Sequence, residues 1–173
     1  MIGVIRVRDR GATPRNLRKV YTAAAKTTWK KVGLYFHKNL RDRRFTELHA
    51  RQANYRRRKG EGMPRDSKGW RNSYTGRKFA KHGHTRPLEF SGETRRLVRS
   101  ANISVTSKGA KVKYAGARKF NFKHPKSQIR MREEFSRVLS SEADAMAGVF
   151  DGGLDRTMKQ SKTTSTVTLT RGT

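Results

Sequence analysis

A run of basic side chains in the middle of the chain has the clearest potential for chemistry. Four consecutive cations form the run Arg56-Arg57-Arg58-Lys59, and Arg65 follows shortly after. Such groups bind phosphate oxygens without regard to base sequence, and aromatic rings can stack on the bases themselves. The aromatic residues interleaved with the basic ones here are Tyr55, Trp70, Tyr74 and Phe79. The pattern predicts contact with a polyanion, or equally with an acidic protein surface.

The charge of the whole chain points to the same kinds of partner. Lys and Arg number 42 against 13 Asp and Glu, which gives a net charge of +29. A molecule with this charge repels itself unless a negative partner neutralises it. The sequence contains none of the standard nucleic-acid-binding motifs. The charge therefore predicts a negatively charged partner, but the sequence does not show which binding motif would contact it.

Residues suited to catalysis or metal binding are scattered. His82-Gly83-His84 could direct two imidazoles at a metal, but no carboxylate pair lies nearby at ligand spacing. Adjacent Glu133 and Glu134 would point to opposite faces of a strand, or lie apart around a helix, so they form no acid–base pair. The chain has no cysteine. We expect no enzyme, no metal, no cofactor and no small-molecule substrate.

A second candidate feature is a corner between a strand and a helix at Pro87–Glu93. Leu88 and Phe90 alternate with a glutamate, as in a half-buried strand. Ser91 is expected to cap the helix that follows, and Gly92 to relieve the turn. Glu93 then places a carboxylate in the first helical turn. The pattern predicts a structural motif made of Pro87, Leu88, Ser91, Gly92 and Glu93.

Helices and a hairpin are expected to surround these two stretches. Thr13-Pro14 opens a long helix whose apolar face continues to Leu40. Residues 101–106 and 110–114 flank Ser107-Lys108-Gly109 as a β-hairpin. Alternation over residues 129–133 favours one more strand, with a helix beginning there as the alternative. Ser140 or Ser141 is expected to cap a final helix.

The 173 residues suit a single domain with two peripheral segments. Residues 56–85 contain charges and structure breakers but no apolar period, so we expect a loop or arm that becomes ordered only on assembly. The tail, residues 160–173, includes an uncharged β-branched stretch in which Val167 and Leu169 are expected to form a strand on a partner's sheet edge or the chain's own. No stretch approaches the about 20 apolar residues of a membrane span, and we expect synthesis in a cytoplasm.

The order of these elements resembles a family of bacteriophage proteins, the tail-completion and virion-morphogenesis proteins of the neck between head and tail. The residues Pro87-Leu88-Glu89-Phe90-Ser91-Gly92 match its pattern of Pro-Leu, two residues and Ser/Thr-Gly. Tyr55–Arg58 and Arg77–His84 look like the family's basic loop. Met131–Phe135, leading into Ser141–Asp144, looks like its last strand and C-terminal helix.

This resemblance implies an α+β fold, with a small, mainly antiparallel sheet flanked by a long N-terminal helix and a C-terminal helix. It also implies a structural subunit that forms a ring in the virion neck, with portal or adaptor and tail proteins as neighbours and packaged DNA as a further partner. Long basic arms beside a small core equally suit a nucleic-acid-binding protein, such as a ribosome-associated subunit. That class remains the alternative.

Overall fold

The computed structural model describes residues 14–115, 117–121 and 128–160. Two long helices dominate these residues: α1 (Pro14–Tyr35) near the N-terminus and α8 (Ser140–Gln160) near the C-terminus. The strands β1 (Ala101–Thr106) and β2 (Gly109–Tyr114) form the hairpin. The shorter elements are η1 (Phe36–Leu40, π-helical), η2 (Asp42–Phe45, 3-10), α2 (Glu47–Gln52), α3 (Lys68–Arg71), α4 (Tyr74–His82), α5 (Glu93–Leu97), α6 (Ala117–Phe120) and α7 (Met131–Ser136).

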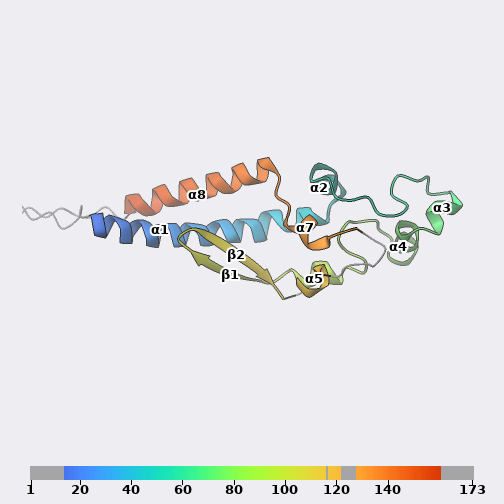
Figure 1. Ribbon diagram of the computed structural model, residues 1–173, viewed down its shortest axis with the longest axis horizontal. Coiled ribbons are helices and arrows are strands. Elements are labelled where there is room, and N and C mark those ends of the chain that lie inside the picture. Colours follow the sequence, from blue (N-terminus) through green and yellow to red (C-terminus); the bar gives the residue numbers. More distant parts are fainter. Residues whose placement is uncertain (1–13, 116, 122–127, 161–173) are drawn as a thin grey trace, which may run out of the picture.

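The architecture is α+β, as the sequence predicts. The helix α1 packs against α8 and also against both strands of the hairpin (Figure 1). The two strands pair antiparallel, from Ala101 opposite Tyr114 to Thr106 opposite Gly109. The short helices α2 to α5 and α7 gather at one end of this long assembly. The described residues therefore form an elongated helix–hairpin body with a compact end built from short helices.

Small residues on α1 allow its neighbours to approach closely. Ala24, Ala25 and Thr28 on this helix are almost fully buried. A Cβ added at Gly153 of α8 would lie 2.9 Å from Cγ2 of Thr28, and one added at Gly33 of α1 would lie 2.8 Å from Cγ2 of Ile103 in β1. Both distances are below ordinary contact. These two glycines therefore bring α8 and the hairpin onto α1.

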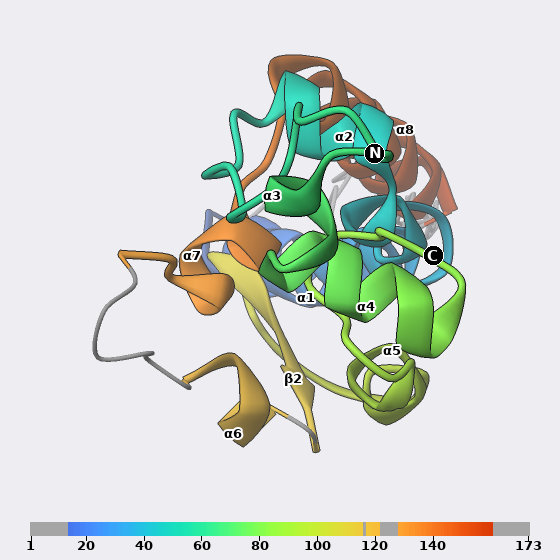
Figure 2. The same ribbon diagram turned by 90° about the vertical axis from the view of Figure 1, so that its right-hand side faces the viewer.

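An aromatic core lies where the body meets the compact end. It contains Phe45, Ala53, Tyr55, Leu88, Val98, Phe120 and Phe135. The ring of Phe135 on α7 contacts those of Phe45, Tyr114 and Phe120, with centroid distances of 6.0, 5.7 and 4.6 Å. Viewed along the body, α7 lies between the segment that contains α3 and the strand β2 (Figure 2). This cluster joins segments that are distant in sequence, since Phe45 and Phe135 come from opposite halves of the chain.

A buried ion pair ties the start of α8 to the segment after α1. The guanidinium of Arg44, which is fully buried, donates two hydrogen bonds to the carboxylate of Glu142. Glu142 also accepts from the backbone N–H of Leu139, at 3.1 Å. Burial alone would raise the pKa of Glu142, but the hydrogen bonds from Arg44 and Leu139 outweigh it and hold the pKa below its ordinary value. The carboxylate is therefore held ionised at the helix start.

Several sequence predictions hold and others are wrong. The hairpin and the long first helix are confirmed, although the last five residues of the predicted helix are π-helical. The segment at 129–133 leads into the helix α7, so the strand is wrong and the alternative is confirmed. Ser140 and Ser141 lie within the first turn of α8, so neither precedes it as a cap.

The prediction of an arm without regular structure at residues 56–85 is also wrong. This segment contains α3 and α4, each begun by a serine whose hydroxyl accepts a backbone N–H: Ser67 from Trp70, and Ser73 from Gly76. The predicted tail strand with Val167 and Leu169 lies outside the described residues. None of the helices among the described residues is long and apolar enough to cross a membrane.

Candidate functional site

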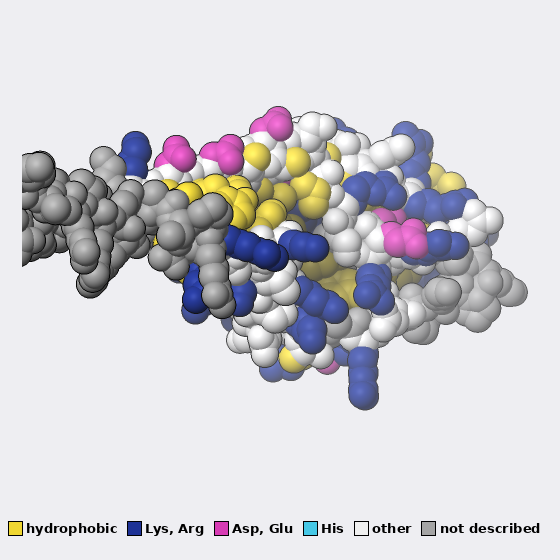
Figure 3. Space-filling view, turned by 60° about the vertical axis from the view of Figure 1, so that its left-hand side comes forward, with side chains coloured by type: hydrophobic (Ala, Val, Ile, Leu, Met, Phe, Trp, Pro, Cys, Tyr) yellow, Lys and Arg dark blue, Asp and Glu magenta, His cyan; other side chains and the backbone are white. Residues whose placement is uncertain are grey.

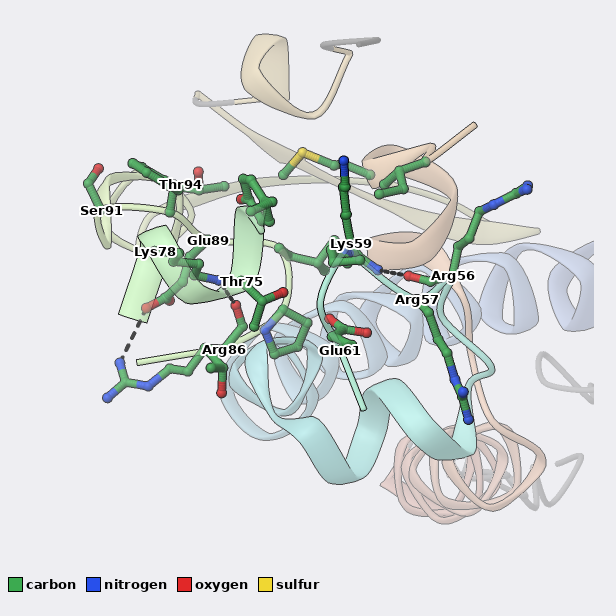
Figure 4. Close-up of a pocket in the computed structure, with 18 of the residues that line it drawn as sticks. Arg56, Arg57, Lys59, Glu61, Thr75, Lys78, Arg86, Glu89, Ser91 and Thr94 are labelled. Carbon is green, nitrogen blue, oxygen red and sulfur yellow. Dashed lines mark hydrogen bonds and ion pairs between the residues drawn. The ribbon is translucent and has the colours of Figure 1, made fainter. Parts of the chain in front are cut away.

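A large cleft opens in the compact end of the molecule. Its volume is about 1400 Å³. It is lined by residues 56–59 and 61, by the start of α4, by residues 85–91, by residues 93 and 94 at the start of α5, and by residues of α6 and the approach to α7. Figure 4 shows how the arm and the 85–94 segment face each other across it. We refer to this feature as the basic cleft.

The two sets of residues that the sequence singles out meet in the basic cleft. Arg56 to Lys59 line it from one side, and Pro87, Leu88, Ser91 and Glu93 line it from the other. Of the other predicted residues, Gly92 lies between two lining residues, while Arg65 lies elsewhere, with its guanidinium carbon 4.9 Å from the centroid of the Phe79 ring. Residues about thirty positions apart in the sequence thus form one site.

The four cations of the basic run have different environments. The side chain of Arg58 is only 9% exposed and forms an ion pair with Glu134 of α7. The same carboxylate accepts the backbone N–H of Arg56, at 3.0 Å. Arg58 therefore fixes the arm to α7. Arg56, Arg57 and Lys59 are exposed, and no ion pair joins them to any residue that the structure describes.

Further exposed cations come from segments that the sequence does not connect with the basic run. Arg77 of α4 and Arg118 of α6 line the same cleft, are exposed, and also lack an ion pair within the described residues. Lys119 also lines the cleft but pairs with Glu93. In the sequence these residues do not stand out, because basic residues occur throughout the chain. Only the fold reveals that they line the same cleft as Lys59.

A buried polar cluster forms one wall of the basic cleft. Lys78 of α4 is only 3% exposed, and its ammonium group donates to the backbone carbonyl of Arg86. Burial lowers the pKa of Lys78 to about 8, although the nearby carboxylate of Glu89 acts in the opposite direction. Glu89 is also buried and lies 3.2 Å from a guanidinium nitrogen of Arg86 and 3.4 Å from Nε2 of His84. Figure 4 shows Lys78, Arg86 and Glu89 together at one side of the cleft.

The predicted strand-to-helix corner has a different backbone from the one expected. Residues 87 and 88 form a turn, and Leu88 has a positive φ of 58°, so neither it nor Phe90 belongs to a strand. The side chain of Leu88 enters the aromatic core because of that turn. Gly92, with φ 82°, is the residue before α5, and this helix has no side-chain cap. The cap assigned to Ser91 is therefore wrong, whereas Glu93 does lie in the first turn.

The aromatic residues predicted to stack on bases do not all remain accessible. Tyr55 and Trp70 are each 8% exposed and belong to the interior. Tyr74, in contrast, is 39% exposed and lines the basic cleft, as does Phe90, which is 40% exposed. Their ring centroids are 5.8 Å apart. The sequence pattern predicts a strand at Phe90, so its position beside the cleft is visible only in the structure.

Metal chemistry has little basis in the described part of the chain. No group of three or more His, Asp or Glu side chains there could hold a metal ion. The rings of His82 and His84 are 6.2 Å apart, and burial together with the charge of Lys78 lowers the pKa of His84. Glu133 and Glu134 pair with different arginines, Arg130 and Arg58. Basic residues outnumber acidic ones among the residues that line the cleft, so the cleft suits an anion better than a cation.

Comparison of the chain with protein-family models, curated proteins and solved structures found no match.

Proposed function

We propose that the chain is a structural, non-catalytic subunit of the neck of a tailed bacteriophage virion, assembling as a ring between head and tail. One observation carries this proposal. The described elements follow the order that the sequence resemblance implies: a long helix, a basic segment, the Pro87–Glu93 motif, a hairpin and a second long helix. The helix α7 replaces the expected last strand, which leaves that order intact.

Exposed apolar side chains on α1 support assembly with other copies. Leu17, Tyr21 and Leu34 are 50%, 48% and 37% exposed. Leu17 and Tyr21 are four residues apart, so they lie on one face of the helix. Figure 3 shows a band of hydrophobic side chains along the helical body. Apolar surface of this kind is typical of a face that another protein covers.

A ring requires two different faces on each subunit, because each copy contacts one neighbour on either side. In this proposal the helical body provides contacts between copies, and the compact end faces portal, adaptor or tail proteins and packaged DNA. The protein would be located in the neck of the virion. The alternative, a ribosome-associated protein, has no need for an apolar band on α1.

The proposal can be tested on purified protein and on particles. We expect the wild-type chain to form rings, seen by negative-stain electron microscopy, and to be found at the neck by immunogold labelling. The double substitution Leu17→Gln and Tyr21→Gln should reduce ring formation without changing the melting temperature. Lys19→Gln with Lys26→Gln, at exposed positions on the same helix, is the matched control and should assemble normally.

Two results would count against the virion role. One is a monomer at every concentration, together with absence from particles. The other is sedimentation of the chain with ribosomes, which would favour the alternative function.

A further inference from the structure

We infer that the basic cleft binds a short segment of single-stranded nucleic acid, with phosphates on its unpaired cations and a base against Tyr74 and Phe90. This inference concerns a ligand of the isolated chain and does not depend on the virion role. It combines three properties of the cleft: its charge, its exposed aromatic pair and its size.

The charge of the cleft is strongly positive and mostly uncompensated. Nine basic residues line it: Arg56, Arg57, Arg58, Lys59, Arg77, Lys78, Arg86, Arg118 and Lys119. Only three acidic residues do so: Glu61, Glu89 and Glu93. Two of these carboxylates already have partners, because Glu89 contacts Arg86 and Glu93 contacts Lys119.

The remaining cations are the ones available to a ligand. Five of the nine are exposed and have no ion pair with a described residue: Arg56, Arg57, Lys59, Arg77 and Arg118. Figure 4 shows Lys59 above the middle of the cleft, with Arg56 and Arg57 reaching outward at its edge. Cations distributed in this way can follow successive phosphates of a strand.

The aromatic pair supplies a surface that a base can contact. Tyr74 and Phe90 lie in contact with each other at the cleft and keep about two fifths of their surface exposed. Large apolar rings that remain exposed beside cations are typical of proteins that bind single strands by stacking. Amide side chains that could hydrogen-bond to base edges are also present at the cleft, at Asn72, Asn121 and Gln128.

The size of the cleft favours a strand over other anions. Its volume of about 1400 Å³ exceeds the range of about 300–1,000 Å³ that is usual for small-molecule sites. A duplex keeps its bases stacked inside, so it could use the cations but not the aromatic pair. A single strand can use both, because its bases are free to turn outward.

A second copy of the chain is the main competing occupant. The helix α8 has a stripe of exposed carboxylates, Asp144, Asp151 and Asp155, with no ion pair to any described residue. Their spacing places them on one side of the helix, and Figure 3 shows acidic groups along the edge of the helical body. However, this stripe offers no group that could stack on the exposed rings of Tyr74 and Phe90. The stripe would instead keep a nucleic-acid strand away from α8 and confine it to the cleft.

The test is a binding measurement on the full chain by fluorescence anisotropy. The probes are a labelled oligothymidylate of about 16 nucleotides and a duplex of the same length. We expect the single strand to bind more tightly than the duplex. The triple substitution Arg56→Gln, Lys59→Gln and Arg77→Gln should weaken single-strand binding at least tenfold and reduce the slope of log K against log salt by about 2.

A matched control removes three exposed charges from α1, through Lys19→Gln, Lys26→Gln and Lys30→Gln. It should change the affinity less than threefold. Tyr74→Leu keeps apolar packing and all charges, and it should weaken single-strand binding by at least about fivefold because it removes the stacking surface. Melting temperatures confirm that each variant is folded.

Four outcomes would overturn the inference. Equal losses in the two triple variants would show attraction by net charge alone. Tighter binding of the duplex, or an unchanged affinity in Tyr74→Leu, would remove the role of the aromatic pair. Self-association that is lost in the cleft variant, without binding of either probe, would identify the second copy as the occupant. The location of the protein in particles is measured separately, so the virion proposal and this one fail independently.

Discussion

At the scale of single residues, Lys78 is the clearest case of a charged side chain in an unfavourable, buried environment. Its ammonium group is almost completely buried, and burial lowers its pKa from 10.5 to about 8. The backbone carbonyl of Arg86 accepts a hydrogen bond from either form of the amine. The carboxylate of Glu89 keeps the pKa from falling further. Near neutral pH the charged form of Lys78 is therefore less strongly favoured over the neutral form than it is in an ordinary lysine.

This has a consequence for stability that pH can reveal. Between pH 8 and 10.5 the unfolded chain holds a proton on Lys78 that the folded chain has released. The free energy of unfolding contributed by this residue therefore rises with pH across that window. Lys78→Met has no such group. We expect the stability of the wild type relative to Lys78→Met to increase from pH 7.5 to 10, by at most about 3 kcal/mol.

Denaturant unfolding at a series of pH values measures this difference. Lys81→Met, an exposed position on the same helix, is the control and should show no comparable trend. Tyrosines that titrate at high pH are present in all three proteins, so their effect cancels. A wild-type advantage that stays constant from pH 7.5 to 10 would show that Lys78 keeps an ordinary pKa.

At the scale of elements, one glycine sets how closely α8 packs against α1. A Cβ at Gly153 would meet Cγ2 of Thr28 at 2.9 Å and its hydroxyl at 3.4 Å. Thr28 is fully buried, so its side chain has no room to move aside. Gly148 lies one and a half turns earlier on the same helix, and a Cβ there would meet nothing within 4 Å.

The two glycines predict opposite effects of the same substitution. Gly153→Ala should destabilise the protein by about 1–3 kcal/mol, since it overpacks the contact between α1 and α8. Gly148→Ala should stabilise it by about 0.5–1 kcal/mol, because alanine favours a helix more than glycine does. Thermal or chemical unfolding of both variants measures this. If Gly153→Ala were as stable as Gly148→Ala, the close packing of the two helices would be wrong.

The elements that the sequence predicts well are those set by local patterns. The hairpin alternates apolar and polar residues around a short turn, and α1 repeats its apolar face over many turns. Residues 129–133, the last three of which belong to α7, are too few for their alternation to distinguish a strand from a helix. Within residues 56–85, α3 and α4 begin at Ser67 and Ser73. Serine caps were recognisable there, but the basic composition suggested an arm instead.

The candidate site was only partly predictable, for reasons of tertiary structure. The basic run is visible in the sequence, yet the burial of Arg58 depends on Glu134, which lies 76 residues away. Leu88 has a positive φ, which is rare outside glycine, and its side chain packs in the aromatic core with residues from distant segments. Neither the burial of Arg58 nor the backbone conformation of Leu88 can be predicted from local sequence patterns. The convergence of Arg77 and Arg118 on the same cleft was hidden for the same reason.

At the scale of the whole molecule, charge is distributed unevenly over an elongated shape. The body presents the carboxylates of α8 together with exposed lysines of α1, and further unpaired cations line the cleft at the compact end. The ion pairs Arg44–Glu142 and Arg58–Glu134 are buried, so dissolved salt screens them little. Most other cations among the described residues are exposed and repel one another across the surface. Repulsion among these positive charges therefore lowers the free energy of unfolding of the isolated chain.

Salt should consequently stabilise the free protein. The screening length falls from about 10 Å at 0.1 M salt to about 3 Å at 1 M, which weakens repulsion among cations that together give a charge of +29. We expect the melting temperature at pH 7 to rise steadily as potassium chloride increases from low to high concentration. The variant Lys19→Gln, Lys26→Gln and Lys30→Gln has three fewer charges and should show a smaller rise. Differential scanning fluorimetry on both proteins measures the two slopes. A melting temperature that falls with salt would mean that exposed ion pairs such as Arg130–Glu133 contribute more than self-repulsion does.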